Sequence, residues 1–237
     1  MTAHVRPHAR PDLTRPGVGL VKASTWRVGT PERQRAAVDA IARTWLARQW
    51  PTDGLLSYTV HVGADGDTLL HYSQWRSEDA YQELVRTERT ARNAAIDAAV
   101  PGIERVALHS YALHRSVVPA PGDDRVPGCV VTVDVEFDGP DPARQRGWVD
   151  AVFEALADDP APHPGGVSAH FHTGLDGTRV LGYAEWESAA AHEEALAAPG
   201  GGFGGPTPQW RRVRTHPGLV RSRVRRYTPA LSLAADA

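Results

Sequence analysis

The sequence has 237 residues, 41% of them hydrophobic and 23% charged, with a formal net charge of −2. This composition is typical of a globular chain of one large domain or two of about 100 residues, and it argues against a disordered chain or a nucleic-acid-binding polycation. No stretch reaches the roughly 20 apolar residues of a membrane span, and no secretory signal opens the chain. We therefore expect a cytoplasmic protein without membrane or nucleic-acid partners. Cys129 is the single cysteine, which excludes an intrachain disulfide and a multi-cysteine zinc site.

Residues 1–16 are polar and broken by proline, so we expect a flexible tail, followed by a first domain over 17–118. Thr30 and Pro31 are typical of an N-cap and first helical position, and Asp65-Gly66 of a hairpin turn. Ser77 caps a second helix whose first turn is acidic. Apolar periodicity then predicts, in chain order, a strand at 18–28, a helix from 31, strands at 57–62 and 68–75, a helix from 78 and a strand at 106–113.

The second half of the chain repeats the first. A shift of about 111 residues places TPERQRAAVDAI (30–41) over DPARQRGWVDAV (141–152) without a gap. The same shift places YTVHVGADGDTLLHYSQWRSEDAYQE (58–83) over AHFHTGLDGTRVLGYAEWESAAAHEE (169–194). Farther on the shift grows, and the glycine-rich run 200–205 is the natural place for the insertion. We therefore predict a linker over 119–128, a second domain over 129–230 and a C-terminal tail over 231–237.

The element order βαββαβ predicts the ferredoxin-like arrangement, in which both helices cover one face of an antiparallel sheet and the other face is bare. Two such repeats can cover each other's bare faces. We therefore expect an α+β chain of two tandem ferredoxin-like repeats that form an intrachain dimeric α+β barrel. Association into a further homo-oligomer stays open.

The segment LLHYSQWRSEDAYQELV (69–85) resembles the signature of the antibiotic biosynthesis monooxygenase family, and YAEWESAAAHEEAL (183–196) is a weaker echo. The resemblance implies a small dimeric α+β barrel protein of aromatic polyketide pathways. It further implies a monooxygenase without flavin, haem or metal, whose partners are an aromatic polyketide of the anthrone or naphthol type and O2. The product of that reaction is a quinone.

Family members proposed to work in this way carry a Trp at the end of the third strand, an Asn four residues earlier and a Tyr six residues later. Trp75 and Tyr81 match this pattern, and His71 stands at the Asn position. A histidine there suits a catalytic base, because its ordinary pKa lies near neutrality. Strand alternation places His71, Ser73 and Trp75 on one face. The resemblance thus assigns catalysis to His71, Trp75 and Tyr81.

Substrate-binding residues are expected beside these three. Arg92 follows Tyr81 by about three helical turns and is expected to point the same way, toward a phenolate or carboxylate. Tyr72 is also expected to bind the substrate. In the second repeat the equivalent places hold Gly182, Trp186 and His192. Trp186 and His192 are therefore expected to bind substrate at a site that lacks the strand base.

Other interpretations compete with these. Trp75 and Trp186 also suit core aromatics, and His71 suits a hydrogen-bonded structural histidine. His170 and His172 have a metal-binding spacing, but no third ligand stands beside them, so no metal site is expected. A cyclase or isomerase would use the same residues without O2, and a non-catalytic module would only bind a small molecule. The haem-degrading branch is disfavoured, because Val85 occupies the place of its histidine ligand.

Overall fold

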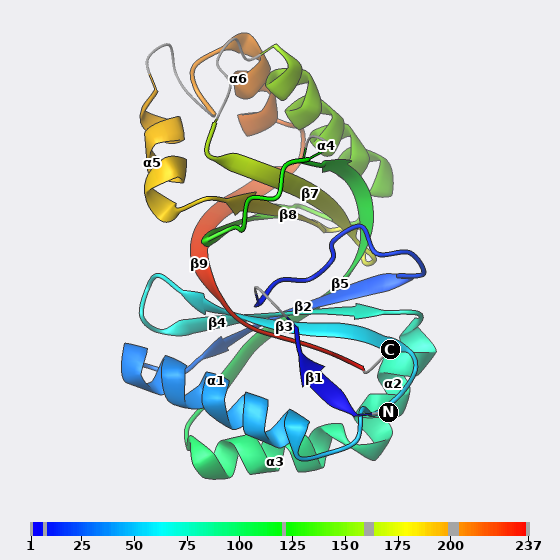
Figure 1. The fold of residues 1–237 in the computed structure, drawn as a ribbon. Coiled ribbons are helices and arrows are strands. Elements are labelled where there is room, and N and C mark those ends of the chain that lie inside the picture. The colour runs from blue at the N-terminus through cyan, green and yellow to red at the C-terminus, as the bar shows by residue number, and fades with distance from the viewer. Residues whose placement is uncertain (1, 7–8, 120–121, 159–163, 199–203, 236–237) are drawn as a thin grey trace. The chain divides into compact units, whose positions relative to one another are not determined.

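The computed structural model describes residues 2–6, 9–119, 122–158, 164–198 and 204–235 (Figure 1). The chain forms two compact units, the first made of Met1–Tyr111 and Tyr227–Ala237 and the second of Ala112–Arg226. Strands β5 (Glu104–Val117) and β9 (Leu219–Ala235) each contribute residues to both units. The packing of the two units against each other, expected as an intrachain dimer, stays a prediction.

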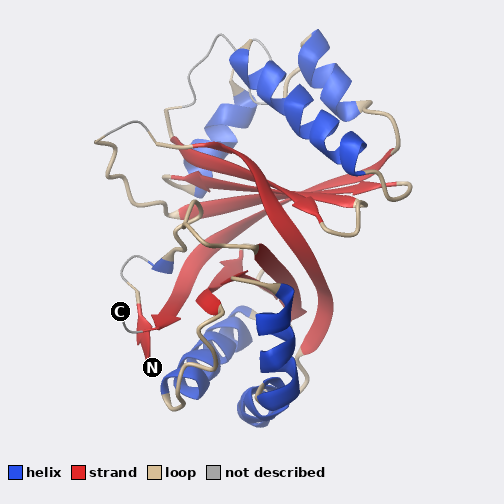
Figure 2. Ribbon diagram, turned by 90° about the vertical axis from the view of Figure 1, so that its right-hand side faces the viewer, coloured by secondary structure: helices blue, strands red, loops and turns tan. Residues whose placement is uncertain are grey.

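The first unit is an antiparallel sheet with helices on one face (Figure 2). Its strand order is β1-β9-β3-β4-β2-β5, and the stretch β5-β2-β4-β3 is the ferredoxin-like order. The remaining strands of this unit are β1 (Ala3–Val5), β2 (Leu20–Arg27), β3 (Leu55–Gly63) and β4 (Thr68–Trp75). Its helices are α1 (Pro31–Leu46), α2 (Glu78–Thr87) and α3 (Arg89–Ala99).

The second unit repeats this plan with the strand order β5-β7-β8-β6 and β9 paired beside β6. Its own strands are β6 (Cys129–Phe137), β7 (Gly166–Gly174) and β8 (Arg179–Trp186). Its helices are α4 (Pro142–Ala157), α5 (Ala189–Ala197) and α6 (Pro208–Arg214). The predicted α+β class is confirmed, and the predicted strands and first helix follow in the predicted order in both halves, while two helices stand in each half where one was predicted.

The structure differs from the sequence-based expectations in the second helix of each half and at both ends of the chain. The expected single helix from residue 78 is two helices, because Glu88 leaves the helical conformation at φ −132° and ψ −25°. The expected N-terminal tail contains β1, which pairs with β9, and the expected C-terminal tail continues β9 to Ala235. Most of the expected insertion at 200–205 lies outside the described residues.

A buried glutamine at the start of the first helix ties that helix to the hairpin in each unit. Gln34 Nε2 donates to the carbonyl oxygens of Gly63 and Thr68, each at 2.9 Å. Gln145 Nε2 donates to the carbonyl oxygens of Gly174 and Arg179 at 3.2 and 2.7 Å. The repeated RQR motif therefore has a structural reason, since each glutamine satisfies two hairpin carbonyls.

The helix starts and hairpin turns predicted from the repeat are also present. Thr30 and Asp141 cap α1 and α4 by accepting hydrogen bonds from backbone N–H groups of the first turn. Gly66 and Gly177 take positive φ angles of 74° and 76° in the two hairpin turns, a conformation that favours glycine. These local signals fix the position of the first helix and the hairpin in each unit.

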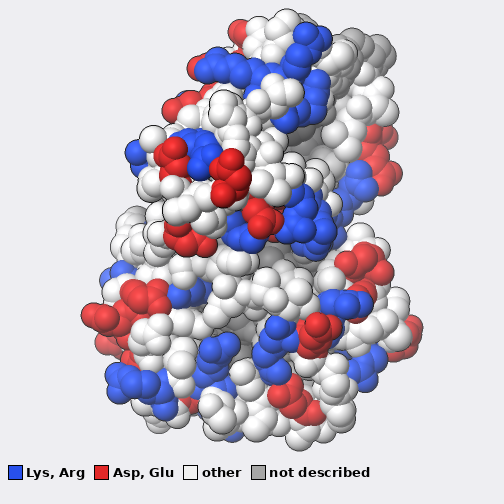
Figure 3. Space-filling model, turned by 180° about the vertical axis from the view of Figure 1, so that it is seen from behind, with Lys and Arg blue, Asp and Glu red and all other residues white. Residues whose placement is uncertain are grey.

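The surface of the chain carries both signs of charge. Figure 3 shows Lys and Arg side chains interspersed with Asp and Glu side chains over the visible face, in keeping with the net charge of −2. No helix in the described part of the chain is long and apolar enough to cross a membrane.

Replacing Gln34 with alanine is expected to lower the free energy of unfolding by about 2 kcal/mol, because two buried hairpin carbonyls lose their donor. Gln145→Ala is expected to have a similar effect in the second unit. The control is Gln82→Ala, an exposed side chain whose loss should stay within about 0.5 kcal/mol. Urea denaturation followed by circular dichroism measures all three. A Gln34→Ala effect no larger than the control would contradict the role given to this side chain.

Candidate functional site

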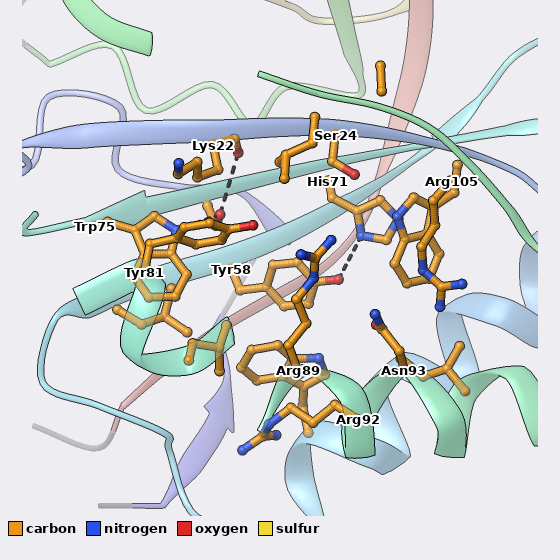
Figure 4. Close-up of a pocket in the computed structure, with 18 of the residues that line it drawn as sticks. Lys22, Ser24, Tyr58, His71, Trp75, Tyr81, Arg89, Arg92, Asn93 and Arg105 are labelled. Carbon is orange, nitrogen blue, oxygen red and sulfur yellow. Dashed lines mark hydrogen bonds between the residues drawn. The ribbon is translucent and has the colours of Figure 1, made fainter. Parts of the chain in front are cut away.

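A cavity of about 280 Å³ lies in the first unit between its sheet and its helices (Figure 4). Strands β2, β3, β4 and β5 supply one side and helices α1, α2 and α3 the other. The volume is close to the lower end of the roughly 300–1,000 Å³ typical of small-molecule sites. Five large aromatic side chains wall the cavity: Trp26, Trp45, Tyr58, Trp75 and Tyr81.

Strand β4 directs alternate side chains into this cavity. His71, Ser73 and Trp75 line it, as strand alternation predicts. Tyr72 is fully buried and does not line the cavity, because it projects from the other face of the same strand. The expectation that Tyr72 contacts a substrate here is therefore not met. Gln74 also projects from that other face, where it bonds to Ser57 Oγ at 2.6 Å.

Trp75 and Tyr81 form one end of the cavity. The Trp75 indole is 2% exposed and donates from Nε1 to Ser73 Oγ at 2.8 Å. The ring of Tyr81 meets it edge-on, with centroids 5.2 Å apart. Lys22 Nζ lies over the Tyr81 ring, 4.0 Å from its centroid. The predicted proximity of Trp75 and Tyr81 is thus present, and both rings offer flat apolar surface.

His71 is held between two aromatic rings at the other end. Its ring centroid lies 4.0 Å from that of Trp26 and 5.8 Å from that of Tyr58, to which it is nearly parallel. The Tyr58 hydroxyl is 2.6 Å from His71 Nδ1. Burial lowers the pKa of His71 to about 3, and the nearby His61 and Arg105 add to that effect. Burial also raises the pKa of Tyr58. Both rings are therefore neutral at physiological pH.

The hydrogen bonding of this pair assigns the His71 tautomer. His71 Nε2 has no hydrogen-bond partner among the described residues. If Tyr58 donates to Nδ1, only the Nε2–H group is unpaired. If Nδ1 donates instead, both Nε2 and the Tyr58 O–H are unpaired, which costs more in a buried site. The favoured state is therefore a neutral imidazole with its proton on Nε2.

Four cationic side chains line the cavity, and three of them are paired with carboxylates. Lys22 Nζ bonds to Glu78 at 2.7 Å, and the Arg105 guanidinium bonds to Asp97 at 2.9 Å. Arg92 bonds to Glu88 at 2.6 Å and to the Gln49 carbonyl at 2.8 Å, with its guanidinium over the Trp45 ring. In Figure 4 this guanidinium points away from His71. Arg92 therefore lines the cavity as expected, while its charge is engaged elsewhere.

Several residues that line the cavity were not predicted from the sequence. Lys22, Ser24 and Trp26 alternate along β2, and the same period-two rule that found the β4 residues applies to them. Tyr58 lies opposite Ser73 on the paired strand, two residues along from the partner of His71, so its contact with His71 depends on the register of the two strands. Arg89 enters the cavity because the helix breaks at Glu88, and the apolar pattern around Glu88 gives no sign of that break.

The second repeat keeps the aromatic pair and loses the histidine. Trp186 and His192 meet edge-on with centroids 4.9 Å apart, as Trp75 and Tyr81 do. His192 Nδ1 accepts from Arg226 Nε at 3.0 Å, and burial together with Arg226 lowers the His192 pKa to about 4. A Cβ at Gly182, the equivalent of His71, would lie 3.4 Å from the Phe171 ring. An aromatic ring thus occupies space beside this position.

His170 and His172 are buried and hydrogen-bonded. His170 bonds to Ser116 and Ser168 at 2.9 and 3.1 Å, and His172 bonds to the Leu181 carbonyl. In the described ranges no group of three or more His, Cys, Asp or Glu side chains is placed to hold a metal ion. Cys129 is buried at the first position of β6, as its place in the sequence predicts.

No protein-family model matches the chain, and no curated protein matches it. Several solved structures are similar to the chain. An anthrone oxidase-like protein is 21% identical with a TM-score of 0.64, over 92% of this chain and 94% of the other. A candidate monooxygenase from Fusobacterium nucleatum is 9% identical with a TM-score of 0.56, over 94% and 97%. Another from Lactobacillus acidophilus is 10% identical with a TM-score of 0.53, over 90% and 97%.

At these identities the likeness shows a shared fold. The chain has the fold of these monooxygenase-like proteins over almost its whole length. Its reaction must be argued from the residues of its own site.

The protonation state of His71 is testable by nuclear magnetic resonance. The ring is expected to stay neutral, with its proton on Nε2, from pH 8 down to about pH 4, because its pKa is held near 3. As the pH falls through about 6.5, His71 becomes protonated in the unfolded chain but stays neutral in the folded chain. The contribution of His71 to the free energy of unfolding is therefore complete above pH 6.5 and is lost as the pH falls toward 3.

Ring ¹⁵N shifts, assigned with a His71→Gln variant, measure the tautomer and the titration. Tyr58→Phe is the matched control, since it removes the hydroxyl that fixes the tautomer and keeps the ring. A His71 titration midpoint near 6.5 would contradict the buried, neutral imidazole.

Proposed function

We propose that the chain is a cofactor-independent monooxygenase, a tandem member of the antibiotic biosynthesis monooxygenase family. Its substrate would be an electron-rich aromatic polyketide of the anthrone or naphthol type. The observation that carries the proposal is the cavity of the first unit, which joins flat aromatic walls to a neutral imidazole whose Nε2 is unpartnered. Such a site fits a planar ring system that bears an oxygen able to accept from Nε2–H.

The reaction draws its reducing power from the substrate. An aryloxide passes one electron to O2, and the resulting radical pair combines to a peroxide that loses water to leave a quinone. Overall, a naphthol loses two hydrogens, one from its hydroxyl group and one from a ring carbon. It gains one oxygen atom and transfers four electrons to O2. The second oxygen atom leaves as water with those two hydrogens. The protein must hold the ring, favour its anion and keep bulk water away.

His71 serves this reaction as a hydrogen-bond donor, which revises the base role expected from the sequence. A group of pKa about 3 is a weak base. Moving a proton to it from a phenol of pKa about 10 would cost about 9–10 kcal/mol before any stabilisation of the products. A neutral Nε2–H instead stabilises the oxyanion that forms on the substrate, and Tyr58 positions the ring through Nδ1.

The first repeat is proposed to carry the reaction. The second repeat has Gly182 where the first has His71, with the Phe171 ring beside it. Trp75 and Tyr81 are proposed to hold the flat substrate in the first unit, and Trp186 with His192 is the remnant of that arrangement in the second. A structural neighbour named as anthrone oxidase-like gives the substrate class some support.

Oxygen uptake with anthrone or a naphthol as substrate tests the proposal. We expect one O2 consumed for each quinone formed. The His71→Ala variant should lower kcat about a hundredfold, the usual effect of losing one donor to an oxyanion. Trp75→Ala should mainly raise KM, because it removes a wall of the cavity. His216→Ala, a histidine of the second unit outside both sites, is the matched control and should retain full activity.

The alternatives are separated by the same assay. Product formed equally well in an anaerobic vessel would contradict the monooxygenase and favour a cyclase or isomerase that uses the same residues. Tight binding of the aromatic without any conversion would favour a non-catalytic binding module. A Soret band in the purified protein would favour the haem-degrading branch.

A further inference from the structure

We propose that the cavity takes its aromatic ligand as an anion, with an ionised ring hydroxyl paired to Arg89. This inference deepens the proposed function by naming the charge state of the substrate, and it rests on that function only where turnover is concerned. Of the described residues that line the cavity, four are cationic and none carries a carboxylate. Three of the four are paired with carboxylates outside the lining, so the cavity keeps one positive charge without a partner and favours one negative charge.

Arg89 differs from the other three cations of the cavity. Lys22, Arg92 and Arg105 each bond to a carboxylate at 2.6 to 2.9 Å. The Arg89 side chain makes no ion pair or hydrogen bond with any of the residues described. The positive charge of Arg89 is thus the one in this cavity that a ligand can neutralise without displacing an existing partner.

The break between α2 and α3 directs Arg89 into the cavity. Arg89 is the first residue of α3 and is half-buried. Figure 4 shows its side chain reaching from the helix into the space between Tyr81 and His71, while Arg92 turns the other way. The charge of Arg89 also opposes the rise that burial causes in the pKa of Tyr81, which places the guanidinium near that ring.

Two polar groups without partners accompany Arg89. Asn93 lies one helical turn farther on the same face of α3 and lines the cavity, and its side-chain amide has no hydrogen bond to the described residues. His71 is 4% exposed and its Nε2 is unpartnered. An aryloxide oxygen can accept from Arg89 and from His71 Nε2–H, and Asn93 can bond to a second oxygen of the ring system.

Binding the substrate as its anion removes the need for a strong internal base. The titratable and charged groups that face this space are Lys22, Arg89, Arg92 and Arg105 as cations and Tyr58, Tyr81 and His71 as neutral rings. A cationic wall with an unpaired guanidinium lowers the pKa of a bound hydroxyl, because it stabilises the ionised form. The electron donor that O2 requires is therefore present on binding.

Anaerobic calorimetry at pH 7 tests this with non-reacting probes. The ligands are 2-hydroxy-1,4-naphthoquinone, which is ionised at this pH, and its neutral methyl ether. We expect the protein to bind the hydroxyquinone about ten- to a hundredfold more tightly than the ether, as one charge-assisted hydrogen bond provides. Arg89→Gln should abolish this preference and leave the affinity for the ether within about twofold.

Two further variants and one further ligand are measured in the same way. Arg86→Gln, an exposed arginine that pairs with Glu83 outside the cavity, is the matched control and should keep the preference. Arg89→Lys should recover part of it, which separates loss of charge from loss of the pocket. 2-Naphthoate tests a carboxylate as the anion, and Arg89-dependent binding of naphthoate without that of the hydroxyquinone would overturn the ring-hydroxyl assignment.

Equal affinities for the two quinones in the unaltered protein, or a preference that survives Arg89→Gln, would also overturn the inference. Because no oxygen and no turnover are involved, these results are independent of the oxygen-uptake assay. An Arg89-dependent preference with no oxygen uptake leaves the anion site standing and removes the monooxygenase. If Arg89→Gln leaves oxygen uptake unchanged, the monooxygenase stands and the anion site at Arg89 is contradicted.

Discussion

The alternation of side chains along β4 determines what the cavity contains. Successive residues of a strand point to opposite faces, so His71, Ser73 and Trp75 reach the space under the helices while Tyr72 and Gln74 cannot. A shift of one residue in the register between β3 and β4 would reverse both sets and move the imidazole out of the cavity. The hairpin turn at Gly66 and the clamp made by Gln34 fix that register.

Burial decides the chemistry of the groups that this strand presents. Desolvation is the largest influence on the pKa of both His71 and Tyr58, and it keeps both rings uncharged. A buried neutral pair can donate and accept hydrogen bonds but cannot hold charge, so charge must come from elsewhere in the cavity. Arg89 provides it, because Lys22, Arg92 and Arg105 are already paired with carboxylates. The site thus places a neutral donor and one unpaired guanidinium around the same space, which is a suitable arrangement for an oxyanion on a flat ring.

The sequence was sufficient for the repeats, for the order of elements and for the face that carries His71 and Trp75, because these follow from short-range periodicity and turn chemistry. It was not sufficient for the choice between Arg89 and Arg92. That choice depends on one non-helical residue, Glu88, within a segment whose pattern reads as continuous helix. The contact of Tyr58 with His71 requires strand register, and the assignment of Tyr72 to the site disregarded the alternation that already excluded it.

The two repeats show which parts of the design serve the fold and which serve the site. The capped first helix, its buried glutamine and the glycine of the hairpin turn are present in both halves, and each satisfies backbone groups that any such unit must satisfy. His71 is present in one half only, and in the other half Gly182 takes its place with the Phe171 ring beside it. Structural demands thus account for these three shared features. The difference between them needs another cause, and an imidazole that leaves Nε2 unpartnered in a buried cavity costs stability unless a ligand accepts from it.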